Sequence, residues 1–270
     1  MKESFEVLKG DSFKIMAELK PGTFDFIFAD PPYLLSNNGL SVKSGKQVSV
    51  NKGDWDKSQG FDADLDFHLK WIGLAKDLLS ANGTIAISGT RHSIYKCGIA
   101  LEMLGFRILN EIIWFKPNGA PNLTGRNFAE SHETIIWASK SKTAKHTFNY
   151  EAMKVYDQSG DKLKAEGKQM RDVWSIPTTP MREKEHGKHP TQKPLELLER
   201  LVLACSNEGD LLLDPFCGSG TTGVASVKHN RRFVGIEKDP AYCKLTSKRI
   251  TGQLKEAAID KGRQGRGLHL

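Results

Sequence analysis

The stretch that decides the fold is LLLDPFCGSGTTGVASVKHNRRFVGIE, residues 211–237. Its pattern predicts a strand over Leu211–Phe216, a glycine turn over Gly218–Gly223, a helix over Thr221–His229 and a second strand over Phe233–Glu237. A strand that leads through a glycine turn and a helix into another strand is the unit from which parallel sheets are built. We therefore expect an α/β protein with a doubly wound, mostly parallel sheet.

The same alternation of short apolar runs and helical spacing extends upstream. Strands are predicted over Phe24–Ala29, Thr84–Ser88, Phe106–Phe115 and Glu133–Ala138, and helices over Asp64–Ser80, Ile94–Leu104, Leu195–Cys205 and Asp239–Ile250. The runs at 106–115 and 133–138, rich in Ile, Trp and Phe, are expected to pair near one edge of the sheet.

The domain organisation follows from where this periodicity fades. Between Ser139 and Lys188 polar and basic residues dominate, and a connection of that length is more typical of a functional insertion than of a plain loop. We predict one domain over residues 1–250 that includes an insertion at 139–188, followed by a basic tail at 251–270 whose end is mobile.

Composition narrows the class of protein. The chain has 270 residues, and 39 Lys and Arg against 32 Asp and Glu give a formal net charge of +7. This excess favours a polyanionic partner, although an ordinary solvated surface explains it equally well. The four scattered cysteines form no C-x-x-C pair, so neither a metal site nor a disulfide framework is predicted. No apolar run approaches ~18 residues, and we expect a cytoplasmic protein without a membrane segment.

The glycine turn predicts a nucleoside cofactor. Gly218, Gly220 and Gly223 satisfy G-x-G-x-x-G, and Glu237 ends the next strand, where a carboxylate can accept hydrogen bonds from ribose hydroxyls. A Walker phosphate loop is excluded because no Lys follows the glycines. The turn by itself fits NAD as well as S-adenosylmethionine, or a tight turn that only packs a helix on a strand.

A second turn predicts chemistry on an amine. The strand at 24–29 runs into Asp30-Pro31-Pro32-Tyr33, and active sites of open α/β sheets lie beyond such strand ends. The Asp30 carboxylate and the Pro31 carbonyl can each accept a hydrogen bond from an exocyclic amine, which frees its delocalised lone pair. The two prolines fix this geometry in advance, and Tyr33 offers a face on which an extruded base can stack. The alternative is a rigid loop with a solvated Asp.

With both turns in one sheet, the sequence resembles the amino-methyltransferases of bacterial restriction-modification systems, from Leu8 to Ile250. In that family F-x-G-x-G (Phe216, Gly218 and Gly220 here) binds S-adenosylmethionine, and D-P-P-Y is the catalytic turn. The catalytic turn comes first in this chain, which is the order of the β class. The resemblance implies the fold of S-adenosylmethionine-dependent methyltransferases, with 139–188 as a target-recognition region.

The resemblance also implies the reaction and further site residues. Asp before Pro-Pro-Tyr favours methylation of adenine N6 over cytosine N4, which stays the alternative, with an NAD-dependent dehydrogenase as a second one. Asp11, in Gly10-Asp11-Ser12, is expected near the adenine of the cofactor, and Thr191, Gln192 and Lys193, in KHPTQKP (188–194), near its methionine end. Ser219 and Thr221 complete the cofactor set, and no metal ligands are predicted. Cys217, inside the glycine turn, is expected to be structural.

DNA is the expected partner, double-stranded and in some relatives single-stranded, with a flipped target base. The segment VSVNKGDWDK (48–57) resembles small GATC-type adenine methyltransferases. A cognate restriction endonuclease and a homodimer are left open. Phosphate contacts are predicted from two basic sets and from the loop Asn118–Arg126. The sets are Lys162, Lys164, Lys168, Arg171, Arg182, Lys184 and Lys188 in the insertion, and Lys43, Lys46, Lys52 and Lys57 in the loop Ser36–Gly60.

Overall fold

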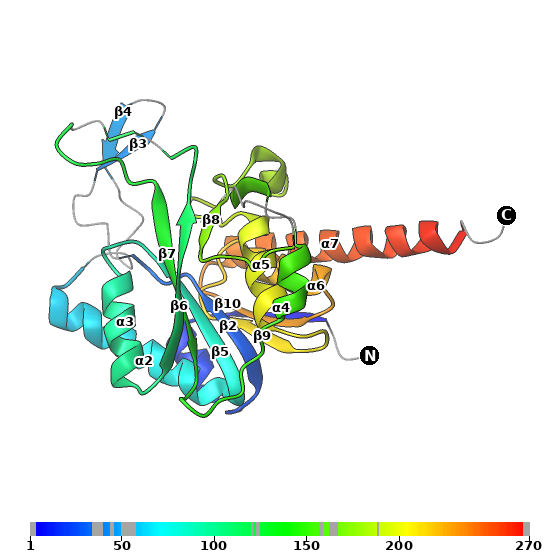
Figure 1. Ribbon diagram of the computed structural model, residues 1–270, viewed down its shortest axis with the longest axis horizontal. Coiled ribbons are helices and arrows are strands. Elements are labelled where there is room, and N and C mark those ends of the chain that lie inside the picture. Colours follow the sequence, from blue (N-terminus) through cyan, green and yellow to red (C-terminus); the bar gives the residue numbers. More distant parts are fainter. Residues whose placement is uncertain are drawn as a thin grey trace.

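The computed structural model describes residues 4–33, 40–43, 46–49, 58–119, 121–122, 125–156, 159–161, 167–187 and 189–266. Within these residues an eight-stranded sheet runs through the molecule (Figure 1). Its strands, in spatial order, are β1 (Phe5–Lys9), β10 (Arg232–Glu237), β9 (Leu211–Asp214), β2 (Phe24–Ala29), β5 (Leu79–Gly89), β7 (His132–Ser139), β6 (Arg107–Phe115) and β8 (Val173–Ser175).

The alternation of strands and helices predicts a mostly parallel sheet, and the observed sheet is parallel except for one strand. β7 lies antiparallel to both β5 and β6, while the other neighbouring pairs are parallel. The chain leaves β2 towards β5 on one side and β9 towards β10 on the other. The strand order therefore reverses between β2 and β9, and open α/β sheets bind their ligands at such a switch point, beyond the carboxyl ends of the strands.

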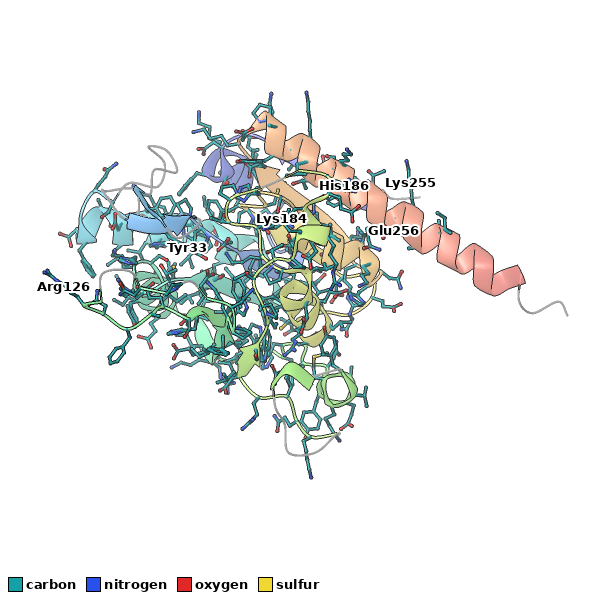
Figure 2. The ribbon with its side chains drawn as sticks, turned by 90° about the horizontal axis from the view of Figure 1, so that it is seen from above. Tyr33, Arg126, Lys184, His186, Lys255 and Glu256 are labelled. Carbon is teal, nitrogen blue, oxygen red and sulfur yellow. The ribbon has the colours of Figure 1, made fainter. Side chains whose placement is uncertain are left out.

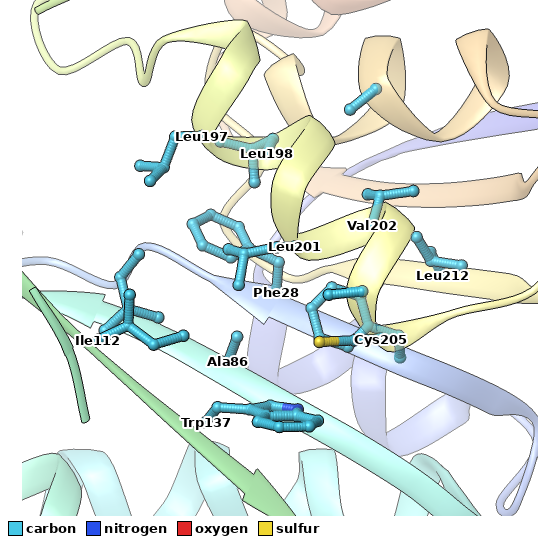
Figure 3. Close-up of a cluster of buried hydrophobic side chains, with 14 of the residues drawn as sticks. Phe28, Ala86, Ile112, Trp137, Leu197, Leu198, Leu201, Val202, Cys205 and Leu212 are labelled. Carbon is cyan, nitrogen blue, oxygen red and sulfur yellow. The ribbon is translucent and has the colours of Figure 1, made fainter. Parts of the chain in front are cut away.

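Helices cover both faces, and the period of two along each strand divides the core. In β2, Ile27 and Ala29 pack with α1 (Ser12–Glu18), α2 (Phe61–Leu78) and α3 (Ile94–Met103). Phe26 and Phe28 point to the opposite face, which is covered by α4 (Tyr150–Val155), α5 (Leu195–Cys205), α6 (Thr221–Lys228) and α7 (Pro240–Arg266). Figure 3 shows the leucines of α5 resting on Phe28, Ala86 and Ile112 of the sheet.

The insertion extends this core. It contributes α4, two short 3-10 turns (Ser159–Asp161 and Met181–Lys184) and the edge strand β8. The guanidinium of Arg200, on α5, is buried against Asp161 of the insertion, with Nη1 2.5 Å from Oδ2. Oδ1 of the same carboxylate accepts a hydrogen bond from the Ser175 amide of β8. The insertion is therefore fixed to α5 by a buried ion pair.

The predicted strands and helices are confirmed, but some of their ends differ and further elements were not predicted. β1, α1, α4 and β8 were not predicted. α2 ends at Leu78 instead of Ser80, and β5 begins at Leu79 instead of Thr84. α7 does not end at Ile250 but continues to Arg266, because the tail is rich in helix-forming residues. It projects beyond the body of the molecule (Figure 1). In the part of the chain that the structure describes, no helix is long and apolar enough to cross a membrane. The short hairpin of β3 (Leu40–Lys43) and β4 (Lys46–Ser49) stands apart from the sheet.

Candidate functional site

A single cavity brings the two predicted turns together. It has a volume of about 680 Å³ and lies at the switch point, beyond the carboxyl ends of β2, β9 and β10. The catalytic turn, Asp30 to Tyr33, forms part of its wall. Of the residues predicted to hold a cofactor, all but Gly220 also line it: Asp11, Thr191, Gln192, Lys193, Phe216, Gly218, Ser219, Thr221 and Glu237. Turns that are more than 180 residues apart in the sequence thus share one wall.

The glycine turn is built from backbone that other residues would strain. Gly218 and Gly220 have φ of +52° and +75°, in the left-handed region that favours glycine. A Cβ on Gly220 would lie 2.4 Å from Thr246 Cγ2 of α7, so this position also needs the missing side chain. Gly220 therefore caps α6 and packs against α7, away from the cavity, while Gly218 faces the cavity.

Two carboxylates hold backbone amides at the wall of the cavity. Glu237 ends β10 and accepts hydrogen bonds from the amides of Gly218, at 2.9 Å, and Asp239, at 2.8 Å. Asp11 caps the N-terminus of α1, because its Oδ1 accepts from the amides of Phe13 and Lys14. Both carboxylates line the cavity, and each oxygen keeps further lone pairs for a ligand hydroxyl or amine.

Gln192 supplies a test of whether a polar ligand fits here. Its Nε2 donates to the Glu183 carbonyl at 2.9 Å, whereas its Oε1 is buried and has no hydrogen-bond partner among the described residues. A buried acceptor without a partner is costly unless a ligand or water satisfies it. Because Gln192 lines the cavity, its orphan oxygen fits a cofactor that brings a donor to this wall.

The catalytic turn is held by contacts that the sequence analysis did not predict. Tyr33 Oη donates to Asp30 Oδ1 at 2.6 Å, and the Lys193 ammonium donates to Asp30 Oδ2 at 2.5 Å and to Tyr33 Oη at 2.9 Å. Glu133 Oε2 lies 3.0 Å from Tyr33 Oη, and Glu133 Oε1 lies 2.5 Å from the Lys116 ammonium. Lys193 was predicted to contact the methionine end of a cofactor. The structure places its charge on the catalytic turn.

The electrostatics of this cluster follow from its burial. Burial raises the pKa of Asp30, and Lys193 acts against that rise. Burial also acts to raise the pKa of Glu133, but Lys193 and Lys116 outweigh it and hold the pKa at about 2. For Lys193, burial acts to lower the pKa, while Asp30 and Glu133 together leave it above its ordinary value. Two carboxylates and two ammonium groups balance their charges, and 15% of the Asp30 side chain remains exposed to the cavity.

Several other functional residues were missed. Glu133 was read only as part of the strand 133–138 and Asp214 only as part of the strand 211–216, and Lys116, directly after the strand 106–115, carried no signal in the sequence. Asp214 lines the cavity and accepts from Thr222 Oγ1 at 2.6 Å, and burial raises its pKa to about 7. Arg249 of α7 donates to Ser219 and Thr221 and so ties the glycine turn to α7. For Cys217, burial raises the pKa well above its usual range, and the protonated thiol fits the structural role expected of it.

The candidate DNA contacts are only partly described. Lys168, Arg171 and Arg182 are exposed, and Arg126 projects from the periphery of the molecule (Figure 2). Asn118 exchanges two hydrogen bonds with Thr178, which ties the loop before β7 to the insertion. Outside the described residues lie Lys52, Lys57, Lys162, Lys164, Lys188 and most of the segment 48–57, and the side chains of Lys43 and Lys46 are not described either.

Comparison with known proteins gives concordant matches. The family model described as DNA methylase matches residues 24–248. The type II methyltransferase M2.DpnII of Streptococcus pneumoniae is 50% identical over 253 residues, which cover 93% of this chain and 91% of that protein. The crystal structure of an M1.HpyAVI–SAM complex has a TM-score of 0.65 and 29% identity, and the match covers 91% of this chain and 98% of that one. The cytosine-N4-specific PvuII DNA methyltransferase has a TM-score of 0.68 at 17% identity, over 92% of this chain and 86% of its own, and shares the fold alone.

Proposed function

The chain belongs to the DNA methylase family, and from this premise we propose that it transfers a methyl group from S-adenosylmethionine to N6 of an adenine flipped out of DNA. The observation that carries the proposal is the meeting of Asp30-Pro31-Pro32-Tyr33 and the glycine turn in one cavity at the switch point. A base pocket and a cofactor pocket that share a wall can bring two reactants into line without a covalent enzyme intermediate.

The cavity is suited to the cofactor in size and in donor set. Its volume of about 680 Å³ falls within the ~300–1,000 Å³ common for small-molecule sites. Asp11 and Glu237 are proposed to bind the nucleoside part, with Phe216 and Gly218 beside it, while Gln192, Thr191, Ser219 and Thr221 hold the amino-acid end. When bound, S-adenosylmethionine supplies a methyl group on a positively charged sulfur, which an amine can attack directly.

The catalytic turn prepares the amine. Asp30 accepts one N–H hydrogen bond and the Pro31 carbonyl accepts the other, which draws the nitrogen towards a tetrahedral geometry and frees its lone pair. The prolines, which fix the backbone, lower the ordering cost of this arrangement. Tyr33 lines the cavity, although only 7% of its side chain is exposed, and its ring provides a face for the extruded base. Lys193 opposes the rise in the pKa of Asp30 that burial causes, and so favours the ionised carboxylate that can accept from the amine.

Adenine rather than cytosine is proposed because Asp, and not Ser, precedes Pro-Pro-Tyr. The fold does not decide between the bases, since a cytosine-N4-specific enzyme shares it. The curated relatives named type II methyltransferases support a role in a restriction-modification system, with a cognate endonuclease as partner. We further propose GATC as the target, on the resemblance of segment 48–57 to GATC-type enzymes.

The test is transfer of labelled methyl from S-adenosylmethionine to unmethylated genomic DNA, single- and double-stranded, with mass spectrometry of the nucleosides. N6-methyladenine is expected, and sequencing of the modified sites then checks GATC. N4-methylcytosine would overturn the base assignment, and no incorporation on either substrate would overturn the function. NAD binding without S-adenosylmethionine binding in calorimetry would favour the dehydrogenase.

The role of Asp30 is tested by substitution. Asp30→Ala should reduce the methylation rate by at least about a thousandfold, while calorimetry still detects cofactor binding. Asp77→Ala, an exposed carboxylate near the end of α2, serves as the matched control and should leave the rate unchanged. Turnover by Asp30→Ala close to that of the unsubstituted enzyme would remove this carboxylate from the mechanism.

A further inference from the structure

One proton at the catalytic turn has two carboxylates within its reach. Tyr33 Oη lies 2.6 Å from Asp30 Oδ1 and 3.0 Å from Glu133 Oε2. A phenol carries a single proton, so it donates fully to one of these oxygens at a time. The Lys193 ammonium, 2.9 Å away, already donates to the same hydroxyl, which directs the proton of Tyr33 towards the carboxylates.

This arrangement engages both oxygens of the carboxylate that the amine of the substrate would need. Oδ1 of Asp30 accepts from Tyr33, and Oδ2 accepts from Lys193 at 2.5 Å. Each oxygen keeps a further lone pair, but an oxygen that already accepts a short hydrogen bond accepts a second one less strongly, so the amine competes with Tyr33 for Oδ1. An alternative acceptor for the hydroxyl proton would remove that competition without moving a charge.

Glu133 is placed to be that acceptor. It stands at the beginning of β7, and its Oε1 is held by Lys116 at 2.5 Å, which aims Oε2 at Tyr33. Only 12% of its side chain is exposed, and the ammonium of Lys193 lies 3.5 Å from the same Oε2. A buried carboxylate flanked by two ammonium groups stays ionised and keeps lone pairs for a hydrogen bond.

We propose that Glu133 is a positioning residue that accepts the hydrogen bond of the Tyr33 hydroxyl when the target amine enters, and thereby frees Asp30 Oδ1 for the amine. This inference rests on the proposed function. No proton is transferred in this step, because the hydroxyl group of Tyr33 only rotates about its C–O bond, from Asp30 towards Glu133. Glu133 therefore touches neither the base nor the cofactor and acts through Tyr33.

The test is a double-mutant cycle between Glu133 and Tyr33, read as kcat on DNA that contains the target adenine. In Glu133→Gln, the ammonium of Lys116 attracts the amide oxygen, so the amide NH₂ faces Tyr33. The Tyr33 hydroxyl then keeps its hydrogen bond to Asp30. We expect kcat to fall about tenfold or more, with KM for DNA and the Kd of S-adenosylmethionine within about twofold. In Tyr33→Phe the competing proton is absent, and Glu133→Gln should then change kcat less than about twofold.

The controls separate this role from a structural one. Glu111→Gln, an exposed carboxylate on β6, should leave kcat unchanged in both backgrounds. If Glu133→Gln does not fold, Glu133→Ala, which removes the acceptor outright, gives the same cycle. The proposal would be overturned if Glu133→Gln lowered kcat equally in the unsubstituted enzyme and in Tyr33→Phe, or if it did not lower kcat in the unsubstituted enzyme. Failure of the proposed function is distinct, since the unsubstituted enzyme itself would then leave adenine unmethylated.

Discussion

At the scale of single residues, the catalytic turn depends on a buried lysine. A carboxylate out of water tends to take up a proton, and a protonated Asp30 could not accept from an amine through the same oxygen. Lys193 opposes this tendency through its ammonium, 2.5 Å from Asp30 Oδ2. The residue thus ties the segment predicted to hold the cofactor to the turn that prepares the base.

Removing that ammonium should change how the rate depends on pH. In Lys193→Met, the pKa of Asp30 rises further because burial then acts without an opposing charge. The acidic limb of the kcat profile should move to higher pH, and kcat at neutral pH should fall on the order of tenfold. Steady-state rates from pH 5 to 9 measure this. Lys142→Met, at an exposed position, is the control, and an unmoved acidic limb in Lys193→Met would show that Lys193 does not tune Asp30.

At the scale of elements, the three glycines of the G-x-G-x-x-G pattern do three different things. Gly218 faces the cavity, Gly220 takes a left-handed conformation against Thr246, and Gly223 lets α6 pack closely on its neighbours. A Cβ on Gly223 would lie 2.5 Å from Ile250 Cδ1 and 2.6 Å from Phe233 Cε1. The pattern therefore encodes packing between α6, α7 and β10 as well as a ligand site.

Gly223→Ala should accordingly lower stability and spare binding. Overpacking of this kind costs about 1–3 kcal/mol in the free energy of unfolding, because rigid core side chains have to shift. Urea unfolding measures the loss, and calorimetry should give a cofactor Kd within about twofold, because Gly223 does not line the cavity. Gly73→Ala in α2, where the added Cβ would meet Leu104 at 3.9 Å, should be neutral or stabilising. Equal unfolding free energies for Gly223→Ala and the unsubstituted protein would contradict this account.

At the scale of the whole molecule, the insertion is part of the sheet and not a separate unit. β8 pairs with β6, and Asp161 is buried against Arg200 of α5. Asn118 and Thr178 join the insertion to the loop before β7. A change of target specificity should therefore preserve these attachments.

The insertion is predicted to carry target recognition. Exchanging residues 139–188 with those of a relative that recognises another sequence, while keeping Asp161, Val173–Ser175 and Thr178, should move the methylated site. Sequencing of methylated genomic DNA reads the outcome. An unchanged site in a folded, active chimera would instead assign recognition to the loops at 36–60 or 118–126.

Acid should weaken the fold through a buried histidine of α2. His68 is fully buried, accepts from Trp71 Nε1 at 3.0 Å, and burial lowers its pKa to about 4. Its folded pKa lies below the unfolded value of about 6.5, so its contribution is present above that value and is lost as the pH falls towards 4. Between pH 7 and 5 the loss is about 2 kcal/mol. His68→Gln keeps an acceptor for Trp71, and its unfolding free energy should fall less over this range. A parallel fall in both proteins would show that His68 is not responsible.

Local sequence patterns were enough to predict most of the central strands and helices and the two turns. Strand and helix periodicity, the glycines and Asp30-Pro31-Pro32-Tyr33 depend on neighbours within a few positions, so they could be predicted without a structure. Element ends were less certain, as β5 and α7 show, because tertiary packing overrides weak local signals. Only the tertiary structure placed Lys193 on Asp30, 163 positions away, and Glu133 on Tyr33, 100 positions away. The order of the strands decides which of their ends meet, and that order is set by packing of the whole sheet rather than by any local pattern.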